Sequence, residues 1–232
     1  MTALSKHARI AGFLYILASA IGIVRLLYVP RVLFVHGDAA ATAGNIAAHE
    51  GLFRLGMLCY LVGGVVWLFV PLALYRLLDR VDHDLAAVMV ILGSLMQAVL
   101  YAINTVTDAA ALALARGTPF LASFSEAQRD GLALLCLNLH HHLDVAFAIY
   151  AGLWLLPLGL LVYRSRFLPR FLGVWLVAGC LGWLAFCVTG IMWPESADHV
   201  FNYAQVLTLG EIATVLWLLI VGARPPRMAA AA

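Results

Sequence analysis

Residues 132–163, LALLCLNLHHHLDVAFAIYAGLWLLPLGLLVY, decide the class of protein to which this chain belongs. A helix that crosses a membrane needs about 20 consecutive, mostly apolar residues. This run is longer than that, and Asp144 is its only charged residue when histidine is neutral. Because an apolar run of this length can satisfy its backbone hydrogen bonds in lipid only as a helix, it predicts a membrane-spanning helix.

Five other runs have the same character, so six spans are expected. The approximate bounds of all six are 10–29, 52–78, 85–115, 132–163, 171–193 and 204–221. Pro30 and Pro194 are expected to end the first and fifth spans, and Pro71 and Pro157 to kink the second and fourth. We therefore predict an all-α fold, a polytopic integral membrane protein in which residues 1–232 form a single six-transmembrane-helix bundle.

The composition of the chain indicates the same class and excludes others. Hydrophobic residues make up 64% of the chain and charged residues 11%, whereas a soluble domain usually carries about 25% charged residues. An ordinary soluble enzyme and a disordered scaffold are therefore excluded, and the net charge of +2 is too small for a nucleic-acid binder. The four cysteines lie in apolar runs and form no CxxC motif, so neither a disulfide scaffold nor a zinc knuckle is indicated. The expected partner is the lipid bilayer.

Lysine and arginine residues in the short loops predict the orientation of the chain. Three of them lie on one side of the expected spans: Arg31, Arg116 and Arg129. Nine lie on the other side: Lys6, Arg9, Arg76, Arg80, Arg164, Arg166, Arg170, Arg224 and Arg227. Because cytoplasmic loops carry the excess of these residues, we expect both termini in the cytoplasm.

The first span has an alternative interpretation as a secretory signal. Lys6 and Arg9 precede it, and Ala18-Ser19-Ala20 within it has the small residues of a cleavage site. The apolar stretch continues beyond that site, which favours a retained helix. Cleavage would leave five spans and would not change the orientation of the others. In the following loop, the small residues before Asn45 predict a helical approach to the second span, as a connector or as a lid.

Several polar residues lie inside the spans, where they face a cavity or a partner far more often than lipid. Their depth can be counted from the cytoplasmic ends at about 1.5 Å per residue. Glu211 is nearer the middle of the membrane, and the others fall in the outer third or at its interface. We therefore predict an outward-opening polar pocket lined by Arg25, Arg54, Asn104, Asp108, His140, Asp144 and Glu211.

The spacing of these residues adds detail to the pocket. Asn104 and Asp108 are four residues apart and share a face of the third span, and His140 and Asp144 do the same on the fourth. Because ion pairing stabilises more where less water competes, we predict that Arg54 turns inward and bridges to a carboxylate of the third, fourth or sixth span.

Three interpretations of this polar cluster remain open. In the first, ion pairs of Arg25 and Arg54 with carboxylates hold the helices together. In the second, the pocket binds or conducts a small solute, and the arginines attract an anion or a lipid headgroup. In the third, His140 and Asp144, with Asp108 or Glu211, hold a divalent metal such as zinc, which would make an intramembrane hydrolase. We predict a non-catalytic or solute- or lipid-handling membrane protein without a cofactor, and the metal-dependent hydrolase is the alternative.

Small residues four apart occur twice inside the spans, at Ala18 and Gly22 and at Ala178 and Gly182. Such pairs let helix backbones approach closely. We expect packing within the chain, and the alternative is a homodimer through these helix faces.

Six segments along the chain carry a resemblance to a known family. They are ARIAGFLY at 8–15, GDAAATAGNI at 37–46, LFRLG at 52–56, YRLL at 75–78, YRSRFLPRFLG at 163–173 and Gly210-Glu211. In this order they resemble a family of bacterial multi-pass membrane proteins that is defined as a domain of unknown function. The resemblance spans nearly the whole chain and implies a bacterial cytoplasmic (inner) membrane protein of about six spans. It supplies no activity, substrate or cofactor, and it implies one histidine where this chain has His140-His141-His142.

Overall fold

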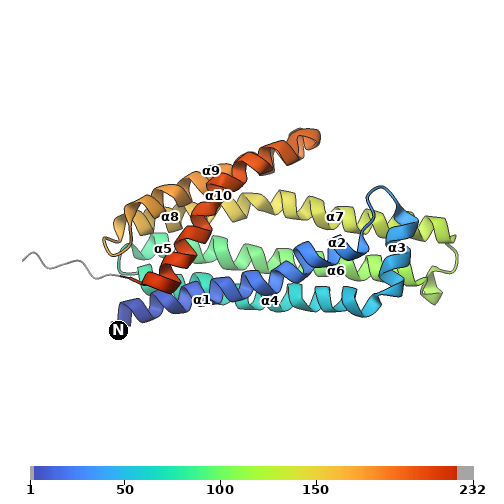
Figure 1. The fold of residues 1–232 in the computed structure, drawn as a ribbon, viewed down its shortest axis with the longest axis horizontal. Coiled ribbons are helices and arrows are strands. Elements are labelled where there is room, and N and C mark those ends of the chain that lie inside the picture. The colour runs from blue at the N-terminus through green and yellow to red at the C-terminus, as the bar shows by residue number, and fades with distance from the viewer. Residues whose placement is uncertain (1–2, 224–232) are drawn as a thin grey trace, which may run out of the picture. The chain divides into compact units, whose positions relative to one another are not determined.

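The computed structural model describes residues 3–223, and within that range every regular element is a helix (Figure 1). Six helical segments are long and apolar enough to cross a membrane: Leu4–Leu33, Glu50–Leu78, His83–Arg116, Glu126–Arg164, Arg170–Met192 and Pro194–Val221. The predicted all-α class and the six spans are confirmed. The cytoplasmic position of both termini stays a prediction, and Arg224 and Arg227, which contribute to it, lie outside the described residues.

Several helices begin before their apolar runs because polar residues cap them. Helix α7 (Glu126–Leu153) starts six residues before the expected span. Its start is fixed by a reciprocal pair, in which the Ser125 backbone N–H donates to Gln128 Oε1 and the Gln128 backbone N–H donates to Ser125 Oγ. This is a capping box, which satisfies backbone donors that the first turn leaves unpaired.

The first span does not end at Pro30, as the sequence suggested. Helix α1 (Ala3–Ile23) leads into a π-helical turn, η1 (Val24–Tyr28), and then into α2 (Val29–Leu33), which has Pro30 in its first turn. Proline clashes with the carbonyl four residues before it in a regular helix. At the end of η1 the backbone N–H of Val29 bonds to the carbonyl oxygen of Val24, five residues back, and Pro30 follows in the first turn of α2, where a missing N–H is tolerated, so the span continues.

The described chain forms two compact units, and four of the spans contribute residues to both. Of the described residues, the first unit comprises 3–17, 66–97 and 145–223, and the second comprises 18–65 and 98–144. The expectation of a single domain stays a prediction.

In the first unit, glycines allow close helix packing. Helices α8 (Leu155–Arg164) and α9 (Arg170–Met192) meet at Gly159 and Gly173, where an added Cβ on Gly173 would lie 2.6 Å from the carbonyl oxygen of Gly159. Gly182 packs on α10 (Ala197–Leu216), where an added Cβ on Gly182 would lie 3.4 Å from the carbonyl oxygen of Ala204. Gly182, one member of the Ala178/Gly182 pair, thus serves packing within the chain. Pro157 follows the break between α7 and α8 at Trp154, as expected for a proline that removes a helix hydrogen bond.

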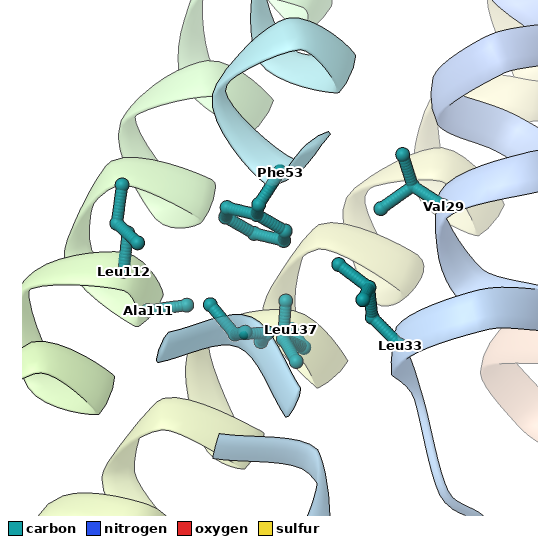
Figure 2. Close-up of a cluster of buried hydrophobic side chains, with 7 residues drawn as sticks. Val29, Leu33, Phe53, Ala111, Leu112 and Leu137 are labelled. Atoms are coloured by element: carbon teal, nitrogen blue, oxygen red, sulfur yellow. The ribbon is translucent and has the colours of Figure 1, made fainter. Parts of the chain in front are cut away.

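The core of the second unit is an apolar cluster around the fully buried Phe53 (Figure 2). Phe53 lies on α4 (Glu50–Leu78), and Ala111 and Leu112 reach the cluster from α6 (Met96–Arg116). The other members are Val29, Leu33, Ile46 and Leu137. Close packing of these side chains against one another stabilises the second unit, which also contains the polar residues described below.

The predicted helical approach to the second span is present as α3 (Ala39–Ala48). The Asp38 side chain accepts from the backbone N–H of Ala41 and caps it. Asn45 Nδ2 donates to the carbonyl oxygen of Leu33 at 3.2 Å, and the backbone N–H of Val35 donates to Thr42 Oγ1 at 2.9 Å. These bonds hold α3 against the end of the first span.

The other small-residue pair also serves packing within the chain. An added Cβ on Gly63 of α4 would lie 3.6 Å from both the carbonyl oxygen of Ala18 and the backbone nitrogen of Gly22. The first and second spans therefore approach closely at this level.

Candidate functional site

The second unit contains a buried ion pair between η1 and α6. Arg25 Nε donates to Asp108 Oδ2 at 2.7 Å, and Arg25 Nη2 donates to Asp108 Oδ1 at 2.6 Å. Arg25 is 3% exposed and Asp108 is 0% exposed. A guanidinium group cannot lose its proton, and the two parallel bonds give this pair both strength and a fixed geometry. The guanidinium carbon also lies 5.9 Å from the centre of the Phe53 ring, which joins the pair to the apolar core.

His140 extends this pair from α7. Its Nδ1 lies 3.0 Å from Asp108 Oδ1 and 3.2 Å from Arg25 Nη2. The residue is 4% exposed, and its other ring nitrogen, Nε2, is buried without a hydrogen-bond partner among the described residues. Nε2 points toward Asp144, whose Oδ2 lies 3.6 Å away, beyond the length of a direct hydrogen bond.

Asp144 lies one helical turn beyond His140 and is held by uncharged donors. Its Oδ1 accepts from Asn104 Nδ2 at 2.7 Å and from the Tyr60 hydroxyl at 3.4 Å. Asn104 Nδ2 also donates to the Tyr60 hydroxyl oxygen at 3.2 Å. The Asp144 side chain keeps 33% of its surface exposed, and no hydrogen bond to its Oδ2 is formed among the described residues.

The pairing of these residues follows from antiparallel packing of α6 and α7. Asn104 contacts Asp144 at one level, and Asp108 contacts His140 one turn farther along. Residues four apart lie on the same face of a helix. When two helices run in opposite directions, the first residue of such a pair on one helix therefore meets the second residue of the pair on the other. The order of polar residues on each helix therefore decides which groups meet.

A cavity of about 740 Å³ lies beside this network within the second unit. It is bounded by the end of the first span and the loop after it on one side, and by α7 on the other. The charged and imidazole side chains in its wall are Arg25, Arg31, His36, His140, His141 and Asp144. His140, with its unpartnered Nε2, and Asp144 thus both line the cavity.

The structure brings together five of the seven residues expected to line one pocket: Arg25, Asn104, Asp108, His140 and Asp144. Tyr60 belongs with them and is not among the residues expected from the sequence. It lies in an apolar run and adds only a hydroxyl group, so the depth of ionisable and amide side chains does not indicate it. Counting hydroxyl groups at the same depth would have found it.

The predicted inward bridge of Arg54 is wrong. Its side chain is 55% exposed, and its Nε donates to Glu50 Oε1 at 2.6 Å on the same helix. The other oxygen of Glu50 pairs with Arg116 Nε at 3.1 Å. A partner one helical turn away keeps both charges near water, so neither has to be desolvated. The buried carboxylate of Asp108 takes Arg25 instead.

Glu211 is not part of this network. It belongs to the first unit, where its carboxyl group accepts from the Tyr15 hydroxyl and, at 2.9 Å, from Trp183 Nε1. His141 and His142 turn away from Asp108, as expected for consecutive helical residues about 100° apart. His142 Nδ1 lies 2.7 Å from the carbonyl oxygen of Asn138.

The residues suggested for a metal site are only partly placed for one. Within residues 3–223, no three or more His, Cys, Asp or Glu side chains are grouped closely enough to hold a metal ion. Asp108 is occupied by Arg25 and His140 Nδ1, which leaves His140 Nε2 and Asp144 Oδ2, 3.6 Å apart on two residues that line the cavity.

A family model described as Domain of unknown function (DUF4386) matches residues 10–222. No curated protein and no solved structure matches the chain.

Proposed function

The chain belongs to the family described as Domain of unknown function (DUF4386), and we propose that it binds a small polar solute or a lipid headgroup without catalysing a reaction. The cavity of the second unit is the proposed binding site. We further propose that the protein lies in a bacterial inner membrane, and that the cavity opens on the side opposite to the termini.

One observation carries this proposal: His140 Nε2 is buried at the cavity wall without a partner among the described residues. Leaving a buried polar group unpaired costs about 1–3 kcal/mol, so such groups in a native protein require an explanation. A network that served only to hold helices together would be expected to satisfy its own members. A ligand in the cavity supplies the missing partner.

The chemistry of the wall indicates what kind of group the ligand presents. The charge of Arg25 is neutralised by Asp108, so this arginine is not a free cation for an anionic ligand. The Asp108 carboxylate is the stronger acceptor near His140 Nδ1, and a proton on Nδ1 leaves a lone pair on Nε2. Nε2 and Asp144 Oδ2 are then two acceptors side by side. A ligand with N–H or O–H donors satisfies both.

Native mass spectrometry of the protein in mild detergent tests this proposal. The wild-type chain is expected to carry a bound species of defined mass. His140→Ala and Asp144→Asn should each lower its occupancy by about tenfold, which corresponds to the loss of one hydrogen bond of about 1.4 kcal/mol. His142→Ala is the matched control, because His142 lies on the same helix outside the cavity wall. A wild-type chain without bound species, or one whose occupancy survives both substitutions, contradicts the proposal.

The metal-dependent hydrolase has one specific observation in its favour. A histidine that binds a metal usually donates its other ring N–H to a carboxylate, which is how Asp108 meets His140 Nδ1. A zinc ion would then be held by His140 Nε2 and Asp144 Oδ2 with further ligands from water or substrate. Elemental analysis of the purified protein separates the two functions. Stoichiometric zinc that is lost in both His140→Ala and Asp144→Ala supports the hydrolase, and metal-free folded protein supports the solute site.

A further inference from the structure

Glu211 is a carboxyl group inside the sixth span that the proposed function does not use. It lies on α10, well within the span Pro194–Val221. In the part of the chain that the structure describes, no lysine, arginine or histidine forms an ion pair with it. An ionised carboxylate without a cation is costly in a membrane interior, so its presence calls for a functional explanation.

The immediate partners of Glu211 are two uncharged donors. Trp183 Nε1 donates to Glu211 Oε1 at 2.9 Å, and the Tyr15 hydroxyl contacts Oε2. Tyr15 in turn packs edge-on against Trp67, with ring centres 4.8 Å apart, and lies 6.2 Å from the ring of Trp154. The carboxyl group is therefore placed among aromatic side chains that offer hydrogen bonds but no charge.

The Glu211 carboxyl group can form hydrogen bonds with these partners in both its ionised and its protonated state, and no heavy atom has to move between the two. In the ionised form, the Tyr15 hydroxyl and Trp183 Nε1 each donate to one oxygen. In the protonated form, Oε1 remains an acceptor for Trp183, the new O–H on Oε2 donates to the Tyr15 oxygen, and the hydrogen of the Tyr15 hydroxyl rotates away from Oε2. A hydroxyl group can reverse its role in this way because it both donates and accepts, whereas an indole only donates.

We propose that Glu211 is a proton-binding site. Its ligand is a proton, which adds to Oε2 to give a neutral carboxylic acid and leaves again to restore the carboxylate. Binding the proton removes the uncompensated charge from the membrane interior, so the protonated acid is the resting form. Carboxyl groups that load and release a proton within a span are the elements of proton relays. This site belongs to the first unit and rests on none of the residues of the cavity.

Infrared spectroscopy of the full chain in detergent tests this proposal directly. A protonated carboxyl group has a carbonyl stretching band that a carboxylate lacks. This band should be present in the wild type, absent in Glu211→Gln, and unchanged in Glu195→Gln, which removes an exposed carboxyl group from the 3-10 turn Pro194–Ser196 before α10. Transfer to heavy water should shift the band, because a site that releases its proton exchanges it for deuterium.

A second variant keeps the test decisive if Glu211→Gln does not fold. Tyr15→Phe removes the hydroxyl partner of Oε2 and should shift the frequency of the same band without abolishing it. A wild-type spectrum with no band that responds to either substitution overturns the proposal. A Glu211 band that never shifts in heavy water also overturns it, because the proton would then be a fixed structural part of the fold.

Discussion

The buried pair of Arg25 and Asp108 permits a quantitative test of the network in the second unit. The perturbation is a double-mutant cycle that combines Arg25→Met with Asp108→Asn. Each single substitution leaves one charge buried without its partner, and the double substitution removes both charges. Methionine retains much of the apolar stem of the arginine, and asparagine retains the shape of the aspartate, so packing changes little.

The magnitude follows from the burial and geometry of the pair. Two short hydrogen bonds join groups that are 3% and 0% exposed. Breaking a buried ion pair by removing one partner costs about 3–5 kcal/mol, mainly because the other charge is stranded. Each single variant should therefore lose about 3–5 kcal/mol, and the double variant should lose less than the sum by about 2–4 kcal/mol. This coupling exceeds the roughly 0.6 kcal/mol average for polar contacts between membrane helices, because both groups are charged and doubly bonded.

Equilibrium unfolding of the protein in detergent, with increasing mole fractions of a denaturing detergent, measures these free energies. The matched control is the cycle of Arg54→Met with Glu50→Gln, an arginine–carboxylate pair of equal length on the surface. Exposed pairs of this kind contribute about 0.2–1 kcal/mol. Equal coupling in the two cycles, or additivity at Arg25 and Asp108, would refute the reasoning that burial makes this pair the anchor of the site.

Three further predictions concern topology, packing and the order of the polar residues. Reporter fusions after Arg80 and Arg170 should read cytoplasmic and fusions near Gly37, Thr118 and Glu195 should read external; the reverse pattern would show that the charge count misleads here. Gly173→Ala places a Cβ 2.6 Å from the carbonyl oxygen of Gly159 and should destabilise the protein by about 1–3 kcal/mol, whereas Gly131→Ala, with open space around it, should be neutral or stabilising by about 0.4–1 kcal/mol in the same unfolding assay. Exchanging the two residues, by combining Asn104→Asp with Asp108→Asn, leaves the composition of the chain unchanged. It places a second carboxylate next to Asp144 and leaves Arg25 without its carboxylate partner, so the variant should be less stable than the wild type. Equal stability of the variant and the wild type would contradict the pairing of Asn104 with Asp144 and of Asp108 with His140.

The spans were predictable from the sequence because lipid imposes a strict requirement on the backbone, but the ends of the helices were not. An apolar run marks the part of a helix that lies in hydrocarbon, whereas caps and turns decide where the helix begins. Ser125 and Gln128 extend α7 beyond its apolar run. The π-turn at 24–28 carries the first span past Pro30. Both effects depend on polar contacts or backbone geometry, which cannot be read from the number of consecutive apolar residues.

Depth along the spans identified most of the candidate site but not its pairing. Arg25, Asp108 and His140 were expected at similar heights, and they are in contact. Height gives no information about the direction in which a residue faces around its helix. Arg54 was at a suitable height and still pairs with Glu50, because a local partner satisfies it near water. Glu211 was similarly assigned from depth, and its partners are Tyr15 and Trp183.

The run of three histidines shows why rotation around the helix decides the chemistry of this site. Each step along α7 turns the side chain by about 100°, so only one of the three can face Asp108. His140 takes that place and is buried, whereas His141 and His142 are exposed. Asp144 lies four residues beyond His140 and therefore returns to the same face, where Asn104 meets it. A second histidine of the run would reach Asp108 only if α7 were wound differently. The site is therefore defined by one histidine, His140, together with Asp108 and the cavity that His140 lines.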